Sequence, residues 1–259
     1  MFKYCSLYSG SSGNSFFVQS TNTNLLIDAG VSCKKIVSAL ANLGIDINTI
    51  DAVLITHEHT DHTKGLVTLS NKYNIPIYAN KKTWEALDNI SCKILKHNIK
   101  FFNVLENFEI GDFTIFPFSI PHDAVAPCGF NIYYNNQKIS VATDIGHMSL
   151  ELLNHLKNSV SIFLESNYDP EILRYSPYPY QLKERISGNN GHLSNETAGK
   201  TLANLYNYGL KNAILIHLSK ENNFPELAYR TIYNEILNCK DLKLDIAPRD
   251  NPSKMFEVG

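Results

Sequence analysis

The chain carries AVLITHEHTDH at residues 52–62. The first five residues of this run suit a buried strand, and four potential metal ligands follow them within six positions. The four are His57, His59, Asp61 and His62. Imidazole nitrogens and carboxylate oxygens are the donors that zinc and similar divalent ions take. Packing so many polar groups at the end of a strand is costly unless something coordinates them, so the run predicts a metal site.

The spacing of these ligands indicates two adjacent ions rather than one. Residues two apart point to the same side of an extended chain but to different sides of a helix, so His57 and His59 can share an ion only in extended chain. A turn after them would let Asp61 and His62 face a second point nearby. A polar strand-to-helix turn with exposed histidines is the alternative, and it requires no ion.

Three more strand-like runs end at a potential ligand: His122, Asp144 or His217. A single histidine or aspartate at a strand end is commonly hydrogen-bonded structure, but all the positions together supply seven ligands. We assign to the first ion His57, His59 and His122. We assign to the second ion Asp61, His62 and His217. Asp144 would bridge the two, because a carboxylate has two oxygens to share. Two ions about 3.5–4 Å apart can hold a hydroxide between them as a nucleophile.

Composition sets broad limits on the class of protein. The 259 residues include 44% hydrophobic residues and a formal net charge of −2, which is ordinary for a globular protein and gives no global attraction to an anionic partner. The five cysteines are odd in number and widely spaced, so neither a disulfide framework nor a cysteine zinc site is expected. The N-terminal residues do not resemble a signal sequence, and no apolar run approaches the roughly 18 residues that span a bilayer. We therefore expect a cytoplasmic protein without membrane contact.

The remaining pattern mixes strands with amphipathic helices. We expect strands over residues 2–8, 16–19, 25–27, 75–78, 130–134, 138–142, 160–164, 213–216 and 242–246, with several short strands over 101–117. We expect helices over 34–43, 63–73, 81–87, 149–156, 195–208 and 225–237. Asp28 ends a strand, where it could either stabilise a turn or serve the site. With no repeat, linker or low-complexity tract, residues 1–259 are expected to form a single domain.

The motifs resemble those of a known family. THEHTDH at 56–62, PHD at 121–123, TD at 143–144 and IHL at 216–218 look like the ligand motifs of the metallo-β-lactamase fold hydrolases. The resemblance covers nearly the whole chain. It implies an α+β fold, the αβ/βα sandwich of two mixed β-sheets flanked by helices, with two divalent metal ions at one edge. Histidine and carboxylate ligands suit zinc, manganese or iron.

A narrower resemblance is to the YycJ/WalJ type of exonuclease. It rests on LYSGSSGNS at 7–15, IDAG at 27–30, HDAV at 122–125, PYPYQLKERI at 177–186, GHLSN at 191–195 and HLSK at 217–220. Such relatives are associated with 5′-to-3′ exonuclease activity on DNA, so the resemblance implies a DNA substrate. GHLSN is also similar to the histidine motif of the tRNA 3′-processing nucleases of this fold, in which that histidine aids phosphodiester cleavage. Tyr180 departs from the pattern, because a tryptophan is expected there.

The same motifs suggest catalytic and substrate-binding residues. His192 could approach the scissile phosphate as an acid or electrostatic aid, and Asp61 could orient the nucleophile. The expected substrate contacts are Tyr180, Lys183, Arg185, Ser194, Asn195 and Lys220. A tyrosine can stack on a base and a cation can meet a phosphate. A solvated loop with packed tyrosines explains residues 168–185 equally well.

Two other functions compete with a DNA exonuclease. The same metal site could hydrolyse a small molecule such as a cyclic phosphodiester, a thioester or a lactone. A non-enzymatic interaction protein on a degenerate scaffold is the third reading, but degeneration should have removed ligands and all seven are present. The oligomeric state and the strand preference do not follow from the residues.

Overall fold

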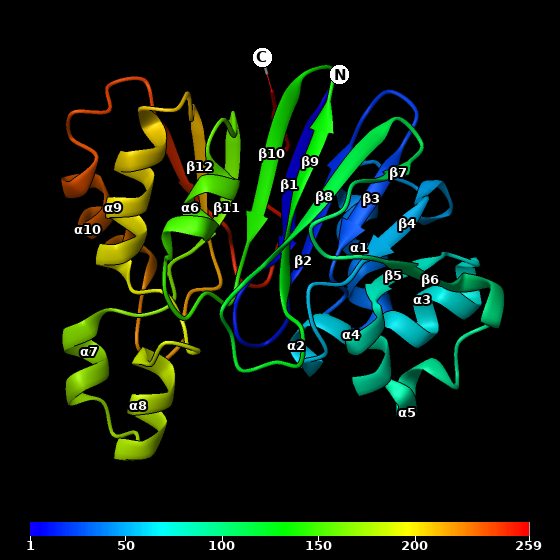
Figure 1. The fold of residues 1–259 in the computed structure, drawn as a ribbon, viewed down its shortest axis with the longest axis horizontal. Coiled ribbons are helices and arrows are strands. Elements are labelled where there is room, and N and C mark those ends of the chain that lie inside the picture. Colours follow the sequence, from blue (N-terminus) through cyan, green and yellow to red (C-terminus); the bar gives the residue numbers. More distant parts are fainter. Residues whose placement is uncertain (259) are drawn as a thin grey trace.

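Two seven-stranded β-sheets pack face to face in the computed structural model, which describes residues 1–258 (Figure 1). The first sheet contains, by position in the chain, β1 (Lys3–Tyr8), β2 (Ser15–Gln19), β3 (Asn24–Ile27), β4 (Ala52–Leu54), β5 (Ile77–Asn80), β6 (Ile99–Phe102) and β14 (Phe256–Glu257). The second contains β7 (Phe108–Ile110), β8 (Phe113–Ser119), β9 (Cys128–Tyr134), β10 (Gln137–Ala142), β11 (Ser161–Glu165), β12 (Asn212–Ile216) and β13 (Lys243–Ile246).

Both sheets are mixed. In the first, β14, β1, β2 and β3 pair antiparallel, and β3, β4, β5 and β6 pair parallel. In the second, β7 to β10 form an antiparallel meander, and β10, β11, β12 and β13 pair parallel. Parallel neighbours end at the same edge of a sheet, so residues that follow β4, β10, β11 and β12 are brought toward one edge.

Helices cover the outer face of each sheet. The helices are α1 (Cys33–Asn42), α2 (Thr60–Thr63), α3 (Leu66–Tyr73), α4 (Lys81–Ala86), α5 (Asp88–Ser91), α6 (Leu150–Leu156), α7 (Pro170–Tyr175), α8 (Tyr180–Ser187), α9 (Asn195–Tyr206) and α10 (Pro225–Glu235), with short 3₁₀ turns at Ile47–Thr49 and Lys96–Asn98. In Figure 1, α1 and α3 to α5 lie beside the first sheet, and α6, α9 and α10 lie beside the second. The pair α7 and α8 extends below α9 and α10.

Strand alternation explains why the chain forms four layers. Along β3, Leu25 and Ile27 pack between the sheets, whereas Leu26 packs against the helices outside. Along β12, Ile214 packs between the sheets and Leu215 packs against the outer helices. Successive side chains of a strand point to opposite faces, so strands that are apolar on both faces must be covered twice. The predicted αβ/βα sandwich is confirmed.

Most of the expected elements are confirmed to within a few residues. Paired asparagines make the hairpin turn between β9 and β10, with φ of +48° at Asn135 and +61° at Asn136. The helix expected over residues 63–73 begins only at Leu66, because the preceding Gly65 donates its N–H to the carbonyl of Ala29 (2.7 Å) instead. Residues 168–185 contain two short helices, which the sequence reading did not predict. Within residues 1–258, no helix has both the length and the apolar surface for a bilayer span.

Candidate metal centre

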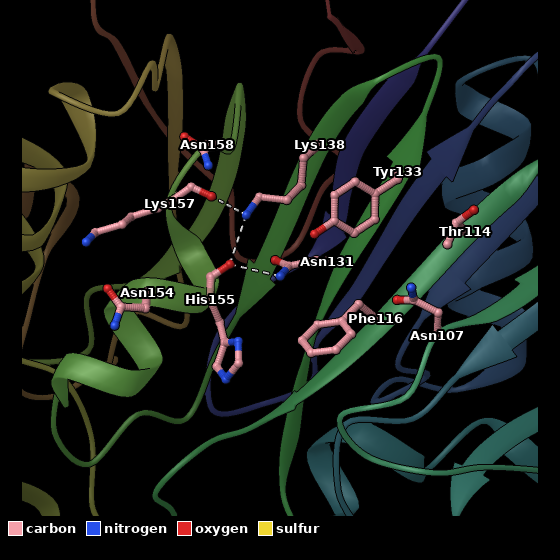
Figure 2. Close-up of a pocket in the computed structure, with 10 residues that line it drawn as sticks. All are labelled: Asn107, Thr114, Phe116, Asn131, Tyr133, Lys138, Asn154, His155, Lys157 and Asn158. Atoms are coloured by element: carbon pink, nitrogen blue, oxygen red, sulfur yellow. Dashed lines mark hydrogen bonds between the residues drawn. The ribbon is translucent and has the colours of Figure 1, made fainter.

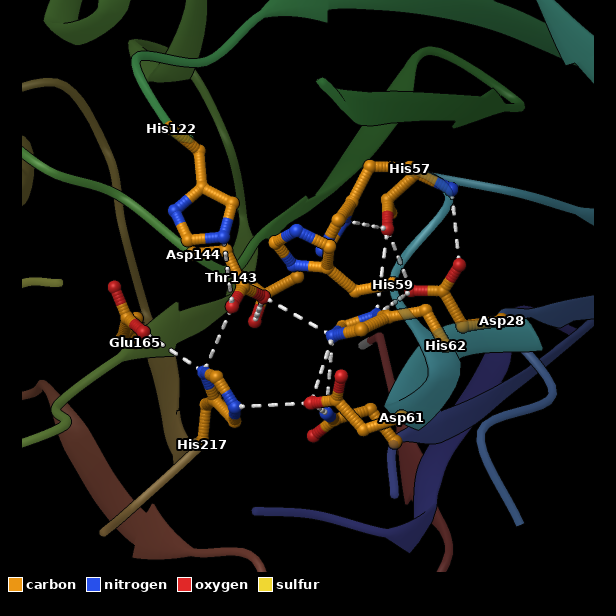
Figure 3. Close-up of polar contacts among 12 residues, drawn as sticks. Asp28, His57, His59, Asp61, His62, His122, Thr143, Asp144, Glu165 and His217 are labelled. Carbon is orange, nitrogen blue, oxygen red and sulfur yellow. Dashed lines mark hydrogen bonds and ion pairs between the residues drawn. The ribbon is translucent and has the colours of Figure 1, made fainter. Parts of the chain in front are cut away.

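The seven predicted ligands lie together at one edge of the two sheets (Figure 3). Two come from the loop between β4 and α2, two from α2 itself, and the others follow β8, β10 and β12. The residues are, in that order, His57, His59, Asp61, His62, His122, Asp144 and His217. Two of them, Asp144 (φ +60°) and His217 (φ +55°), hold the left-handed backbone conformation, as does Asp28 (φ +61°) at the end of β3. Residues other than glycine rarely adopt it, and such positions cluster at functional sites.

The ligand atoms form overlapping clusters. One cluster is His57, His59 and His122, and another is Asp61, His62 and His217. Within each cluster, one potential ligand atom per residue lies within 4.8 Å of the others. Asp144 joins the two, because it clusters with His57 from the first and His62 from the second. This geometry can hold two neighbouring cations that share the Asp144 carboxylate.

Hydrogen bonds aim the imidazole rings. His122 Nδ1 donates to the carbonyl of Gly191 (3.0 Å), and His217 Nδ1 donates to the carboxylate of Glu165 (2.8 Å). Both acceptors lack a proton, so Nδ1 carries a hydrogen and Nε2 is the nitrogen left to face a cation. The buried Nε2 atoms of His57, His122 and His217 have no hydrogen-bond partner among residues 1–258. Buried polar atoms are normally satisfied, so three orphaned nitrogens in one cluster fit a bound cation.

Asp28 orients two further rings. Its Oδ2 accepts hydrogen bonds from His62 Nδ1 (2.7 Å) and from the Thr56 hydroxyl (2.8 Å), and its Oδ1 accepts one from the Thr56 N–H (2.9 Å). The Thr56 hydroxyl therefore accepts from His57 Nδ1 (2.9 Å). Of the two roles left open by the sequence, the structure gives Asp28 that of a support for the site.

Glu165 is a site residue that the sequence reading missed. Its Oε1 accepts from Nδ1 of both His192 and His217, each at 2.8 Å. Its Oε2 accepts from the backbone N–H groups of Ile145 (2.7 Å) and Leu193 (3.0 Å). The carboxylate is completely buried and fully engaged, so it links the proposed catalytic histidine to a proposed metal ligand.

Electrostatics favour cations at the centre. Burial alone would raise the pKa of Asp144, but the charges of His217 and His62 hold it well below its usual range. Burial lowers the pKa of His57, and His62 lowers it further. Burial would also lower the pKa of His217, but Asp144 above all raises it to about 10. The pKa of His62 is raised as well, so protons on His62 and His217 offset the buried carboxylates, a role that divalent ions fulfil when bound.

The loop between β1 and β2 braces the centre from outside. Ser9 Oγ accepts from the N–H of His217 (2.8 Å), and the Asn14 N–H donates to the carbonyl of Asp61 (2.8 Å). Gly30 bonds the same loop, since its N–H donates to the carbonyl of Asn14 (2.8 Å). A Cβ on Gly30 would lie 1.5 Å from the Asp61 carbonyl oxygen, so only glycine allows this approach.

The expected substrate contacts occupy different environments. Tyr180, Lys183 and Arg185 lie on α8, and Arg185 Nε is 2.6 Å from Asp123 Oδ2. Lys220 is exposed just beyond His217. Tyr180 and Arg185 are exposed, whereas Lys183 is half-buried and donates to the carbonyl of Arg174 (2.7 Å).

The two polar residues at the start of α9 are engaged elsewhere. Ser194 caps the helix, because its hydroxyl oxygen accepts from the Thr197 N–H (3.2 Å). Asn195 is completely buried, and its side-chain oxygen accepts from Ser166 (2.5 Å) and Asn223 (2.8 Å). The structure therefore places Asn195 among the supports of the site and out of reach of a substrate.

Away from the metal centre, a polar cavity of about 530 Å³ lies on the second sheet (Figure 2). None of the seven proposed ligands lines it. Lys138 Nζ donates there to the carbonyl oxygens of His155 (2.9 Å) and Lys157. These carbonyls lie at the C-terminal end of α6, where a cation satisfies backbone acceptors that the helix leaves unpaired. Burial lowers the pKa of Lys138 to about 8. The contacts give Lys138 the role of a helix cap.

Comparison with known proteins identifies the class. Residues 23–218 match the family described as the beta-lactamase superfamily domain. The structure of the metallo-β-lactamase fold protein YhfI from Bacillus subtilis superposes with a TM-score of 0.72 at 16% identity, covering 98% of this chain and 100% of that one. Zinc-bound PqqB from Methylobacterium extorquens gives a TM-score of 0.72 at 16% identity, covering 99% and 100%. The chain belongs to the metallo-β-lactamase superfamily of hydrolases, and its His/Asp cluster fits the use of divalent metal.

Two relatives that match over most of the chain are exonucleases. The chain is 40% identical to the exodeoxyribonuclease WalJ of Streptococcus pneumoniae, over 99% of this chain and 98% of the relative. It is 37% identical to the exodeoxyribonuclease YycJ of Bacillus anthracis, over 87% and 86% of the two chains. The resemblance to the YycJ/WalJ type that the motifs suggested is confirmed.

Proposed function

We propose that this protein is a metal-dependent exodeoxyribonuclease that degrades DNA in the 5′-to-3′ direction. The observation that carries the proposal is the 40% identity to WalJ over nearly the whole chain, together with the clustering of all seven proposed ligands. A DNA substrate would place the activity in the cytoplasm. The polarity rests on the resemblance to the YycJ/WalJ type.

The proposed cofactor is a pair of divalent ions, zinc, manganese or iron. His57, His59 and His122 would hold the first, and Asp61, His62 and His217 would hold the second. Asp144 would bridge them, which its position between the clusters supports. When bound, such ions polarise the phosphate oxygens and activate water for attack on phosphorus.

His192 is the proposed acid or electrostatic aid. Its ring lies 5.2 Å, between centroids, from each of the rings of His122 and His217, so it borders both ligand clusters. Glu165 holds its Nδ1, and burial, which alone would lower the pKa, is outweighed by that carboxylate, so the pKa of His192 is raised. A protonated His192 has Nε2–H to donate toward the leaving oxygen. Asp61 would orient the nucleophile from the other side.

The test combines metal analysis with end-labelled DNA. The purified protein is loaded with zinc, manganese or iron in separate samples and incubated with single- and double-stranded DNA labelled at either the 5′ or the 3′ end. We expect stepwise release from the 5′ end and about two ions per chain. His122→Ala should lose both metal and activity, because it removes one ligand of the first cluster.

His97→Ala is the matched control, since His97 is an exposed histidine that bonds only Asn74 (2.8 Å) among residues 1–258. It should keep the wild-type metal content and rate. Fully metallated wild-type protein that leaves every DNA substrate intact would overturn the proposed function. Hydrolysis of a small thioester or cyclic phosphodiester by that same sample would favour the small-molecule alternative.

A further inference from the structure

A cavity of about 310 Å³ is lined by residues that follow β12 and β13 and by the loop after β1. The polar residues of its lining are Ser9, Ser219, Asn223 and Arg249, and all the others are apolar. Its volume lies at the lower end of the roughly 300–1,000 Å³ that small-molecule sites occupy. The lining contains one cation and no carboxylate, so the cavity suits a small anionic group.

The cavity adjoins the metal centre. β12 and β13 are parallel neighbours, with Leu215 opposite Ile246, so the residues after both strands lie at the same edge of the sheet as the metal centre. Leu218, which lines the cavity, directly follows the proposed ligand His217. Ser9 Oγ, in the cavity wall, accepts from the N–H of His217 (2.8 Å). The cavity therefore begins one residue away from a proposed ligand of the second ion.

Arg249 supplies the positive charge of the cavity. Its Nη2 donates to the carbonyl of Leu218 (2.8 Å), which holds the guanidinium in place. Its Nη1 lies against Gly10, since a Cβ added to that glycine would be 2.6 Å away. No carboxylate of residues 1–258 forms an ion pair with Arg249. A guanidinium has five N–H donors in a planar fork that matches the oxygens of a phosphate, so most of these donors remain available.

Two buried hydroxyls add further donors. Ser9 and Ser219 are only 4% and 8% exposed, and each hydroxyl oxygen already accepts a backbone N–H. A hydroxyl also has one hydrogen to donate, and neither of these hydrogens finds an acceptor in the described part of the chain. The side-chain oxygen of Asn223 already accepts two hydrogen bonds. The polar side chains of the lining thus offer unused donors and no unused acceptor.

Unused donors around a cation favour an oxyanion as the ligand. A phosphate group has several acceptor oxygens and a charge opposite to that of Arg249. Hydrogen bonds to an ionised partner are roughly twice as strong as those between neutral groups. A carboxylate would satisfy the same donors, but the proposed substrate, DNA, carries its anionic charge on phosphates.

We infer that this cavity binds a phosphate of the DNA strand next to the phosphate that is cut at the metal centre. The inference rests on the proposed function and adds a contact that none of the expected substrate residues makes. Arg249 and the hydroxyls of Ser9 and Ser219 donate to this second phosphate. Phosphate contacts fix the register of a strand without reading its sequence. Because His217 borders the cavity, the contact also places the neighbouring phosphodiester at the second proposed ion.

The experiment measures how metal-loaded protein binds a labelled DNA duplex whose linkages are phosphorothioates, which slow cleavage. Fluorescence anisotropy is recorded over a series of salt concentrations for the wild type, Arg249→Gln and Arg249→Lys. Arg249→Gln should weaken binding roughly 10- to 150-fold, because a charge-assisted hydrogen bond is lost. The slope of log affinity against log salt should also fall by about 0.9, the value for one phosphate contact. Arg249→Lys keeps the charge, so its slope should equal that of the wild type.

Arg230→Gln is the matched control, because Arg230 is an exposed arginine on α10 that does not line the cavity. It removes the same charge and should keep the affinity and the salt slope of the wild type. Ser219→Ala is a second test of the cavity, because it removes one hydroxyl donor and leaves the guanidinium unchanged. It should weaken binding roughly 2- to 10-fold without changing the slope.

Metal content is measured in every variant, because Arg249 also holds the carbonyl of Leu218. Weaker DNA binding and a smaller slope in Arg249→Gln, at the metal content of the wild type, would support the inference. Metal loss in Arg249→Gln that Arg249→Lys does not restore, together with unchanged DNA binding by Ser219→Ala, would show a purely structural role and overturn it.

Two results separate this inference from the proposed function. Wild-type affinity and salt slope in Arg249→Gln, with DNA still degraded by the wild type, would overturn the phosphate contact alone. Metallated wild type that hydrolyses bis(p-nitrophenyl) phosphate but not DNA would overturn the proposed function.

Discussion

Replacing Glu165 with glutamine tests the link between the proposed catalytic histidine and the metal ligands. One carboxylate oxygen accepts from His192 and His217, and the other accepts from the N–H groups of Ile145 and Leu193. Glutamine offers one accepting oxygen and one donating NH₂ group at nearly unchanged size. In either orientation the NH₂ group faces groups that also donate, and it cannot accept their hydrogen bonds.

Both orientations damage the centre. If the NH₂ group faces the backbone, two buried N–H groups lose their acceptor. If it faces the histidines, His217 must accept at Nδ1, which moves its proton to Nε2 and removes the lone pair that a cation needs. A hydrogen bond to a charged group contributes about 1.5–3 kcal/mol. Loss of a residue that orients a ligand typically lowers metal affinity about 10- to 100-fold, which is about 1.4–2.7 kcal/mol. The two ranges overlap, so we expect Glu165→Gln to weaken metal binding by about 1.4–2.7 kcal/mol.

The assay is a competitive titration of metal-free protein with zinc or manganese against a chromophoric chelator. Glu151→Gln serves as the control, because the Glu151 side chain is 78% exposed and reaches only His155 at 4.0 Å. The control variant should bind the metal with wild-type affinity. If Glu165→Gln keeps a metal affinity within about twofold of the wild type, the assignment of Glu165 as a support of the ligand set is refuted.

Three further outcomes follow from the same geometry. Asp28→Asn removes the carboxylate that aims His62, so metal affinity should fall about 10-fold or more in the same titration; an unchanged value would contradict the orienting role. The pKa of His217 is raised to about 10, so its ring binds a proton at neutral pH that a cation must displace. Metal affinity should therefore rise with pH up to that pKa, with proton uptake by the buffer visible in calorimetry; pH-independent binding would contradict this. Gly30→Ala forces a Cβ against the carbonyl of Asp61, so the free energy of unfolding should fall by about 1–3 kcal/mol or more in denaturant titrations. Wild-type stability in this variant would show that the loop can move away from the added Cβ without cost.

The sequence predicted the fold and singled out seven residues that the structure brings together, because both depend on local signals. An apolar run that ends at a histidine or aspartate marks the strand and its carboxyl end together. His57 and Asp144 are examples, and each follows a strand whose residues pack on both faces. The same rule would have found Glu165, but the expected strand stopped at residue 164, one position short of the observed end of β11.

The features that were not predicted depend on tertiary contacts. Gly65 delays the start of α3 through a bond to Ala29, which lies far away in the chain, so helical periodicity could not reveal it. The helices α7 and α8 span only 6 and 8 residues and flank Pro177 and Pro179, which is also a pattern typical of a loop. The burial of Asn195 depends on its contact with Asn223, and no local pattern indicates that pair.

The wide separation of the ligands in the chain affects when the protein can become active during translation. The proposed first ion has its three histidines once His122 has been made, but the proposed second ion must wait for His217. Ribosomes add roughly 5–20 residues per second, so this interval lasts roughly 5–20 s. A nascent chain would therefore carry a half-built centre and remain inert toward nearby nucleic acid until β12 joins the second sheet.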